Sequence, residues 1–265
     1  ILADVFARYN KMFGKNVFFL TGTDEHGQKV QEAASKLKIT PDEHVNKFYK
    51  NYTELWKKLN IDYDRFIRTT ETNHIKKVQK MLTHLWDIGE IYIDEYEGLY
   101  SVSEERFITE KEYQEGTYRE VTKLKEKNYF FKMSKYQEKL IKHINDNPDF
   151  IIPETRKNEV LGFLKKPLGD LCISRPKSRL EWGIEIPFDN NYVTYVWFDA
   201  LLNYITGVEW DNNEKIFNHW WPADYHLIGK DIITTHAVYW ITMLMAAKLE
   251  LPKHIVAHGW WLMDD

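Results

Sequence analysis

The fold of this sequence is decided by the stretch Leu227-Ile228-Gly229-Lys230-Asp231-Ile232 and by what surrounds it. The segment Tyr225 to Ile228 has the composition of a short buried strand. From Asp231 to Ala247 the apolar residues have the spacing of an amphipathic helix, and a second strand candidate follows at His254 to Ala257. A strand, a helix and another strand in this order predict two parallel strands joined by a crossover helix.

The first part of the chain shows the same alternation. Apolar residues recur at helical spacing from Ile1, and Asn16 to Leu20 is a short apolar run bounded by glycines, as expected of a buried strand. The other predicted elements are helices at 28–37, 42–59 and 73–89 and a strand at Asp64 to Arg68. The pattern as a whole predicts an α/β fold with a parallel sheet.

The alternation is interrupted between about residues 93 and 165. Glu95 to Val102 and Glu120 to Phe131 have the pattern of short β segments joined by charged turns. We therefore expect one domain formed by 1–93 and 166–265, with 94–165 as an insertion. No Pro-rich or Ser-rich linker flanks the insertion, so it should pack against the sheet domain.

Composition limits the classes of function. A net charge of −4 over 265 residues gives no general attraction for nucleic acid, so any RNA contact needs a local basic patch or chain outside this sequence. The single cysteine, Cys172, excludes an intramolecular disulfide and fits a reducing compartment. We expect a cytoplasmic protein, with mitochondrial import left open because a presequence would precede Ile1. No apolar run approaches the ~20 residues that span a bilayer, so no membrane role is expected.

Three clusters of polar residues follow predicted strands, where ligands bind in parallel α/β sheets. They are Thr21 to Gly27, Gly229-Lys230-Asp231 and Ala257 to Trp261. Glycines allow close approach of the backbone, a lysine can meet phosphate, and Asp24 or Asp231 can accept from an ammonium or from ribose hydroxyls. Each cluster by itself is as typical of a turn with a helix cap.

Two sets of side chains recur at helical spacing and would each share a helix face. They are Trp197, Ala200 and Tyr204, and Ile232, His236 and Trp240. Such stripes are more often core than pocket, but a buried imidazole among apolar residues needs a partner, either a structural carbonyl or a ligand. Arg175 is equally compatible with a surface charge and with a clamp for an anion. The sequence has no P-loop, G-x-G-x-x-G, H-E-x-x-H or G-x-S-x-G motif, which disfavours covalent catalysis.

Several motifs, in their order and spacing, resemble those of the methionyl-tRNA synthetases along the whole chain. They are Leu20 to Val30, Tyr129 to Tyr136, Ile173-Ser174-Arg175, Trp197-Phe198-Asp199-Ala200, Gly229-Lys230-Asp231-Ile232 and His258-Gly259-Trp260. These class I enzymes have a Rossmann-type catalytic domain interrupted by a connective-peptide insertion. The resemblance implies that fold here, and an enzyme that converts L-methionine and ATP, with Mg²⁺, into methionyl-adenylate and then charges tRNA(Met).

The resemblance also implies roles for particular residues. Asp24 would hold the α-ammonium of methionine, and Lys230 and Arg175 would be further catalytic residues. The side chains implied around the thioether are Trp197, Ala200, Leu201, Tyr204, Ile232, His236 and Trp240. The residues implied at ATP are Gly229, Lys230, Asp231, His258, Gly259 and Trp261.

The sequence departs from the family pattern in three places. The HIGH-type signature would lie upstream of Ile1 and the KMSKS loop after Asp265, so the chain is expected to be a fragment with weak activity by itself. The similar stretch Lys132 to Lys135 lies in the insertion and is interpreted as a decoy. Ser101 and Glu104 stand where many relatives have zinc-binding cysteines, so no zinc is expected.

Two alternatives from other classes stay open at this point. One is a ligase that joins another amino acid or small acid to AMP. The other is a non-catalytic RNA-binding module derived from a synthetase. A cysteinyl enzyme would need a zinc site that one cysteine does not supply, and about 70 inserted residues are too few for the editing insertion of leucyl, isoleucyl or valyl enzymes. The sequence gives no information on the oligomeric state.

Overall fold

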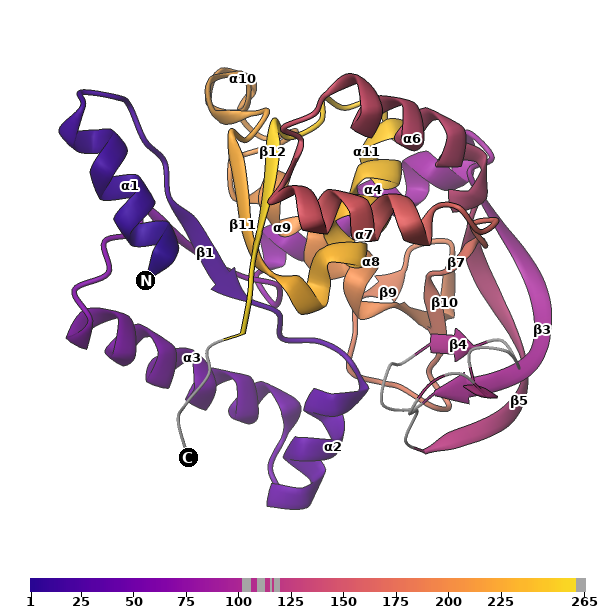
Figure 1. The fold of residues 1–265 in the computed structure, drawn as a ribbon. Coiled ribbons are helices and arrows are strands. Elements are labelled where there is room, and N and C mark those ends of the chain that lie inside the picture. Colours follow the sequence, from indigo (N-terminus) through magenta and orange to yellow (C-terminus); the bar gives the residue numbers. More distant parts are fainter. Residues whose placement is uncertain (102–105, 109–112, 115, 117–119, 261–265) are drawn as a thin grey trace.

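The computed structural model describes the chain except for residues 102–105, 109–112, 115, 117–119 and 261–265. Its parallel strands form two groups. Strand β1 (Leu20–Thr23) pairs with β2 (Arg65–Arg68), and β11 (Tyr225–Gly229) pairs with β12 (His254–His258). A short strand, β6 (Ile151–Ile152), pairs in parallel with the other side of β12. The predicted α/β fold with parallel strands is confirmed (Figure 1).

The four predicted helices of the first part are present. They are α1 (Leu2–Met12), α2 (Gln28–Leu37), α3 (Pro41–Lys58) and α4 (Thr72–Asp87). Helix α3 begins with a capping box, in which the Thr40 side chain accepts from the Glu43 amide and the Glu43 carboxylate accepts from the Thr40 amide. The Pro41 that follows fits the first turn of a helix because its missing N–H is not needed there.

The first strand was predicted too early. Pairing starts at Leu20 and not at Asn16, because the backbone N–H of Phe19 donates to the Asp64 side chain (2.7 Å) instead of entering a ladder. Gly22 lies within the strand and does not end it. A Cβ at Gly22 would lie 2.1 Å from the Ile67 carbonyl oxygen, so this pairing requires glycine.

The β segments expected in the insertion are present, and the first begins earlier than predicted, at Ile91 and not at Glu95. Strand β3 (Ile91–Ser101) pairs with β5 (Val121–Phe131) in an unbroken antiparallel register from Ile91↔Phe131 to Ser101↔Val121. The other elements joined to this hairpin are β4 (Arg106–Ile108) and β7 (Leu171–Cys172).

The limits 94–165 for the insertion stay a prediction, but the topology bears on them. After β5 the chain forms the 3₁₀ turn η1 (Met133–Tyr136), helix α6 (Gln137–Asp146), strand β6 and helix α7 (Glu154–Phe163). Because β6 pairs with β12, part of 94–165 belongs to the parallel sheet. This pairing favours an insertion that ends near Phe131.

The last third of the chain supplies a small antiparallel sheet and several short helices. The sheet contains β8 (Ser174–Pro176), β10 (Asp189–Thr194) and β9 (Glu185–Ile186), in that order. The helices are α8 (Val196–Leu201), α9 (Asn203–Thr206) and α10 (Glu214–Trp220). One apolar core joins α4, β5, α7, β11 and the helical segment after β11. No described helix is both long and apolar enough to cross a membrane.

The helix predicted from Asp231 to Ala247 is not regular. It begins with the 3₁₀ turn η2 (Lys230–Ile232), continues as the π-helical segment η3 (Thr235–Trp240) and ends as α11 (Ile241–Ala246). A π-helical turn is wider than an α-turn, so residues at i and i+4 no longer share one face. His236 and Trp240, at the two ends of this spacing, both still pack against the Tyr204 ring.

Candidate active site

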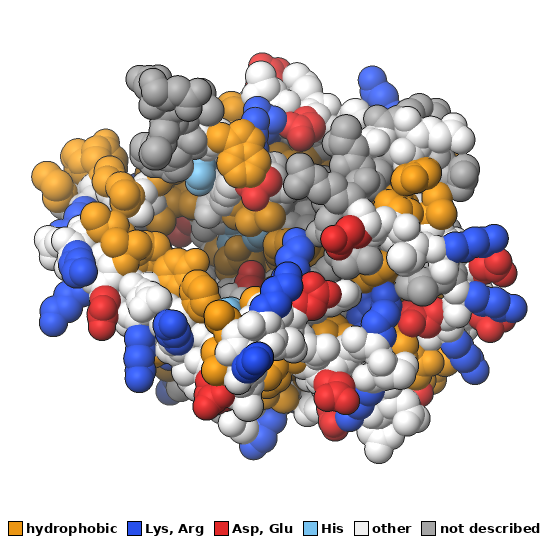
Figure 2. All heavy atoms as spheres, turned by 90° about the horizontal axis from the view of Figure 1, so that it is seen from below, with side chains coloured by type: hydrophobic (Ala, Val, Ile, Leu, Met, Phe, Trp, Pro, Cys, Tyr) orange, Lys and Arg blue, Asp and Glu red, His pale blue; other side chains and the backbone are white. Residues whose placement is uncertain are grey.

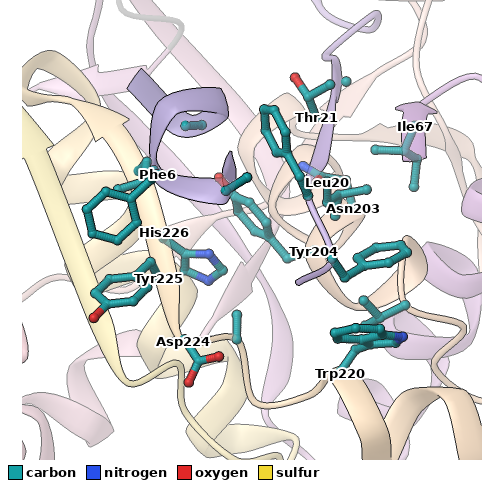
Figure 3. A pocket seen from close by; sticks show the side chains of 18 of the residues that line it. Phe6, Leu20, Thr21, Ile67, Asn203, Tyr204, Trp220, Asp224, Tyr225 and His226 are labelled. Atoms are coloured by element: carbon teal, nitrogen blue, oxygen red, sulfur yellow. The ribbon is translucent and has the colours of Figure 1, made fainter. Parts of the chain in front are cut away.

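A cavity of about 540 Å³ lies between β1 and β11. Helix α1 contributes Phe6, β1 contributes Leu20 and Thr21, and β11 contributes Tyr225 and His226 (Figure 3). Within the described residues, β1 pairs only with β2 and β11 only with β12, so the two facing strand edges border the cavity. Figure 2 shows a face hollowed at its centre, with imidazole and carboxylate side chains visible inside the hollow.

The structure brings most of the residues expected at an amino acid together. Those that line the cavity are Asp24, Trp197, Ala200, Leu201, Tyr204, Ile232 and His236. Trp240 does not line it among the described residues. The Trp240 side chain is fully buried behind the wall, where its indole N–H donates to His226 Nε2 at 3.1 Å. The Tyr204 ring lies against both side chains, with ring centroids 5.7 Å from His236 and 6.0 Å from Trp240, so Trp240 supports the ring wall, and its expected contact with methionine stays a prediction.

Asp24 supplies the open carboxylate of the cavity. Its side chain is exposed to the cavity, and no hydrogen bond or ion pair of this carboxylate is found among the residues that the structure describes. Surrounding protein atoms and the nearby Asp199 carboxylate raise the pKa of Asp24 to about 6. At neutral pH the group is therefore a largely ionised acceptor that still lacks a partner.

The wall opposite is made of neutral rings whose protons can be placed. His236 Nδ1 lies 2.9 Å from the Ile232 carbonyl oxygen, which can only accept, so Nδ1 carries the proton. His236 Nε2 then accepts from the Tyr204 hydroxyl at 2.7 Å. Burial lowers the pKa of His236 to about 4, so the imidazole is uncharged at neutral pH. The partner left open by the sequence is thus a backbone carbonyl together with a tyrosine.

The sequence analysis missed His226, which belongs to the same wall. Its ring centroid lies 4.1 Å from that of Tyr204 at an interplanar angle of 33°, and burial lowers its pKa to about 3. His226 had been treated only as part of a strand. The available signal was its position two residues before the buried Ile228, which puts both side chains on one face of the strand.

The residues expected at ATP lie apart from the cavity wall. Gly229, Lys230 and Asp231 follow β11, and His258 and Gly259 follow β12; none of these lines the cavity in the described part of the chain. A Cβ at Gly229 would lie 2.5 Å from Asp231 Oδ1, the end of a side chain that can turn away, so this contact does not require glycine. Trp261 lies outside the described residues.

Arg175 also lies away from the cavity. It is on β8, it is only 3% exposed, and its guanidinium lies 4.6 Å from the ring centroid of Tyr195 and 5.6 Å from that of Tyr100. Its Nη1 donates to the Ser174 carbonyl at 2.7 Å. Burial rules out the surface-charge alternative, and the catalytic role of Arg175 stays a prediction.

The stretch Lys132 to Lys135 is used for packing. The Met133 side chain is buried in the core, the Ser134 amide donates to Asp170 at 3.0 Å, and Lys135 forms an ion pair with Glu90. None of these residues lines the cavity in the described part of the chain. These contacts favour the interpretation of the stretch as a decoy.

A parallel α/β fold with an open carboxylate and aromatic rings at the ends of its strands is compatible with several nucleotide-dependent enzymes, and comparison with known proteins narrows the class. The family model described as "tRNA synthetases class I (M)" matches residues 1–118 and 116–265. The chain belongs to this family of class I tRNA synthetases.

The relatives in this family are methionine–tRNA ligases. That of Clostridium perfringens (strain 13 / Type A) is 50% identical over 270 residues, which cover 100% of this chain and 42% of the relative. That of Bacillus subtilis (strain 168) is 44% identical over 282 residues, with the same coverage. The chain thus spans less than half the length of the curated relatives it matches.

Solved structures agree in fold. Mycobacterium tuberculosis methionyl-tRNA synthetase bound by methionyl-adenylate matches with a TM-score of 0.91 and 43% sequence identity, over 97% of this chain and 52% of that chain. The apo form of the same enzyme matches with a TM-score of 0.82 and 41% identity, over 97% of this chain and 51% of that chain.

Proposed function

We propose that the protein of which this chain is a part activates L-methionine with ATP to methionyl-adenylate and transfers the methionine to tRNA(Met). The observation that carries the proposal is the open Asp24 carboxylate in a cavity whose other wall consists of neutral rings. The names of the relatives and the methionyl-adenylate bound in a related structure support it.

Methionine fits a cavity that has a carboxylate on one side and neutral rings on the other. Asp24 would accept from the α-ammonium, and the thioether would lie among the side chains of Trp197, Tyr204 and His236. Sulfur contacts with aromatic rings are worth about 0.3 to 1.5 kcal/mol each. A wall without net charge favours an uncharged side chain, which disfavours a ligase for a charged amino acid.

The reaction needs positioning more than a nucleophile from the enzyme. The methionine carboxylate would attack the α-phosphate of ATP in line, with pyrophosphate as the leaving group. Lys230 would stabilise charge on the phosphates, with Gly229 and Asp231 beside it, while backbone groups of His258, Gly259 and Trp261 would receive the adenine. These assignments, and that of Arg175, are proposals carried by the family membership.

Magnesium would bind mainly through the ATP phosphates. No group of three or more His, Cys, Asp or Glu side chains that could hold a metal ion occurs in the described ranges. Mg²⁺ commonly takes one or two carboxylates together with substrate phosphates, and Asp231 after β11 could provide one. The absence of zinc stays a prediction, because positions such as Glu104 lie outside those ranges.

The tRNA partner and the cytoplasmic location follow from the same proposal. The net charge of −4 means that a basic patch or chain beyond these residues would contact the tRNA. We expect weak activity from residues 1–265 alone, so the test uses the complete protein.

The test is ATP–pyrophosphate exchange by the complete protein with a panel of the twenty amino acids. We expect exchange with methionine, and rates at least about tenfold lower with leucine, isoleucine and valine, whose branched side chains differ in shape. Exchange driven best by another amino acid would replace methionine as the substrate. Methionine binding without any exchange would favour a non-catalytic module.

A further inference from the structure

A buried carboxylate that the proposed reaction does not use joins the segments that form the cavity. Asp199 is on α8, it is 0% exposed, and its two oxygens accept from two imidazoles. His26 Nδ1 lies 2.7 Å from Oδ2, and His74 Nε2 lies 3.0 Å from Oδ1. Burial by itself would raise the pKa of Asp199, but the bonds and charges of the two histidines hold it below its ordinary value. Asp199 is therefore ionised, and both imidazole nitrogens donate to it.

The two bonds of Asp199 join segments that are far apart in the chain. His26 is two residues after Asp24 in the loop that leaves β1, and His74 is in the first turn of α4. Asp199 lies between Trp197 and Ala200, which line the cavity. One carboxylate thus connects the loop that carries the open acid with the helix that carries the aromatic wall.

The rest of the loop is held just as firmly. The Glu25 carboxylate accepts from Thr23 Oγ1 at 2.8 Å and from Arg68 Nε at 2.7 Å. The Glu25 amide donates to Thr69 Oγ1 at 2.9 Å, and its carbonyl accepts from Trp182 Nε1 at 2.6 Å. The neighbours on the C-terminal side of Asp24 therefore use their polar groups to hold the backbone, while the Asp24 carboxylate faces the cavity.

We propose that Asp199 is a positioning residue that fixes the Asp24 carboxylate relative to helix α8 through its bond to His26. This inference rests on the proposed function, because it assigns Asp24 to the α-ammonium of methionine. A buried carboxylate with two donors has one stable geometry, since moving either imidazole leaves a buried charge partly unpaired. The ammonium and the thioether of one substrate molecule are then held at a set separation.

The central experiment measures binding of two ligands to the complete protein and its Asp199→Asn variant by calorimetry. The ligands are methionine and the methionine analogue that lacks the α-amino group. Asparagine keeps the shape but turns an NH₂ group toward one of the imidazole donors and removes the charge. We expect methionine to bind about tenfold to a hundredfold more weakly, since misplacement by 1 Å can cost that much. The analogue, which has no ammonium for Asp24, should change by less than about twofold.

Two substitutions of His26 keep the proposal testable if Asp199→Asn fails to fold. In His26→Asn the side-chain amide keeps a donor near the position of Nδ1, so methionine binding should stay within a few fold of the unmodified protein. In His26→Leu the donor is lost, and methionine binding should weaken as in Asp199→Asn. Equal binding by the two His26 variants would contradict the proposal.

A matched control removes another carboxylate that bonds to helix α4, the helix that carries His74. Asp211 accepts from Lys77 Nζ of α4 at 3.3 Å and, among the described residues, has no bond to the Asp24 loop. Asp211→Asn should change thermal stability without changing the ratio of the two ligand affinities. In an Asp24→Asn background, Asp199→Asn should add little to the loss of methionine affinity.

The outcomes separate the two proposals. If the unmodified protein does not bind methionine, the proposed function fails. If it binds methionine but Asp199→Asn weakens both ligands equally, or adds its full effect in the Asp24→Asn background, Asp199 is only structural and the inference is overturned. Unchanged binding in Asp199→Asn overturns it as well.

Discussion

The loop after β1 and the segment after β11 both carry an aspartate at the end of a parallel strand, but their surroundings differ. Beside Asp24, the polar groups of Glu25 and His26 form a dense network of buried bonds. Beside Asp231, the Lys230 ammonium lies 5.6 Å from the Trp260 ring centroid. The side chains of Lys230 and Asp231 have no hydrogen bond within the part of the chain that the structure describes. The comparison teaches that the loop proposed to hold the amino acid is fixed by its own buried bonds, whereas the described side chains proposed to meet ATP have no such network.

The largest effect should come from removing the open acid. Asp24→Asn removes the charge that would pair with the α-ammonium, so methionine-dependent ATP–pyrophosphate exchange by the complete protein should fall at least about a hundredfold in kcat/KM. The control Asp42→Asn changes an exposed aspartate on α3 that accepts from the Asn46 side chain, and it should leave exchange unchanged. Normal kinetics in Asp24→Asn would remove the assignment of the ammonium site.

The Lys230→Met variant tests the segment after β11, which is proposed to meet ATP. Loss of one charge-stabilising donor in an active site costs about a hundredfold in kcat. Because Lys230 does not line the described cavity, methionine binding measured by calorimetry should stay within about twofold. A large loss of methionine affinity would mean that the two sides are not independent, and the contrast between them would be lost.

Both halves of this contrast were partly predictable from the sequence. The strand, helix and strand after Tyr225 and the grouping of Asp24 with Trp197 and His236 follow from periodicity, from the rule that ligands bind at strand ends and from the family motifs. One error has its physical cause in a tertiary contact. Gly22 looked like the end of a strand, but it lies inside β1 because the Ile67 carbonyl approaches it.

Other features could not be predicted because they depend on contacts between distant parts of the chain. The π-helical segment Thr235–Trp240 has no signal in the apolar spacing, which predicts a regular helix. The bonds of Asp199 to His26 and His74 join residues 173 and 125 positions apart. The strand pattern places the His226 side chain on the buried face, but its contacts with Tyr204 and with the Trp240 indole depend on the tertiary fold.

The pH dependence of methionine affinity should reflect Asp24. With a pKa of about 6, Asp24 is mostly ionised at pH 7 and mostly protonated at pH 5, and only the ionised form pairs with an ammonium. Affinity should therefore fall as the pH falls through 6, by about tenfold between pH 7 and 5. His236 and His226, with pKa values of about 4 and 3, stay neutral in this range. Weak residual binding by Asp24→Asn should not vary over the same range, and a variation of equal size there would assign the titration to another group.

The smallest effect should come from the ring wall, where two substitutions of His226 separate its contacts. Gln can place its side-chain oxygen near the position of Nε2 and still accept from the Trp240 indole, whereas Asn is too short to reach it. The buried indole N–H left without an acceptor in His226→Asn costs about 1 to 3 kcal/mol of stability, so this variant should melt at a lower temperature than His226→Gln. Both variants lose the ring that lies tilted against Tyr204, so their KM for methionine should rise by a similar factor of a few fold. If the two variants melt alike but differ in KM, His226 acts directly on the substrate and does not support Tyr204 and Trp240. The ring wall would then be held less firmly than the loop after β1.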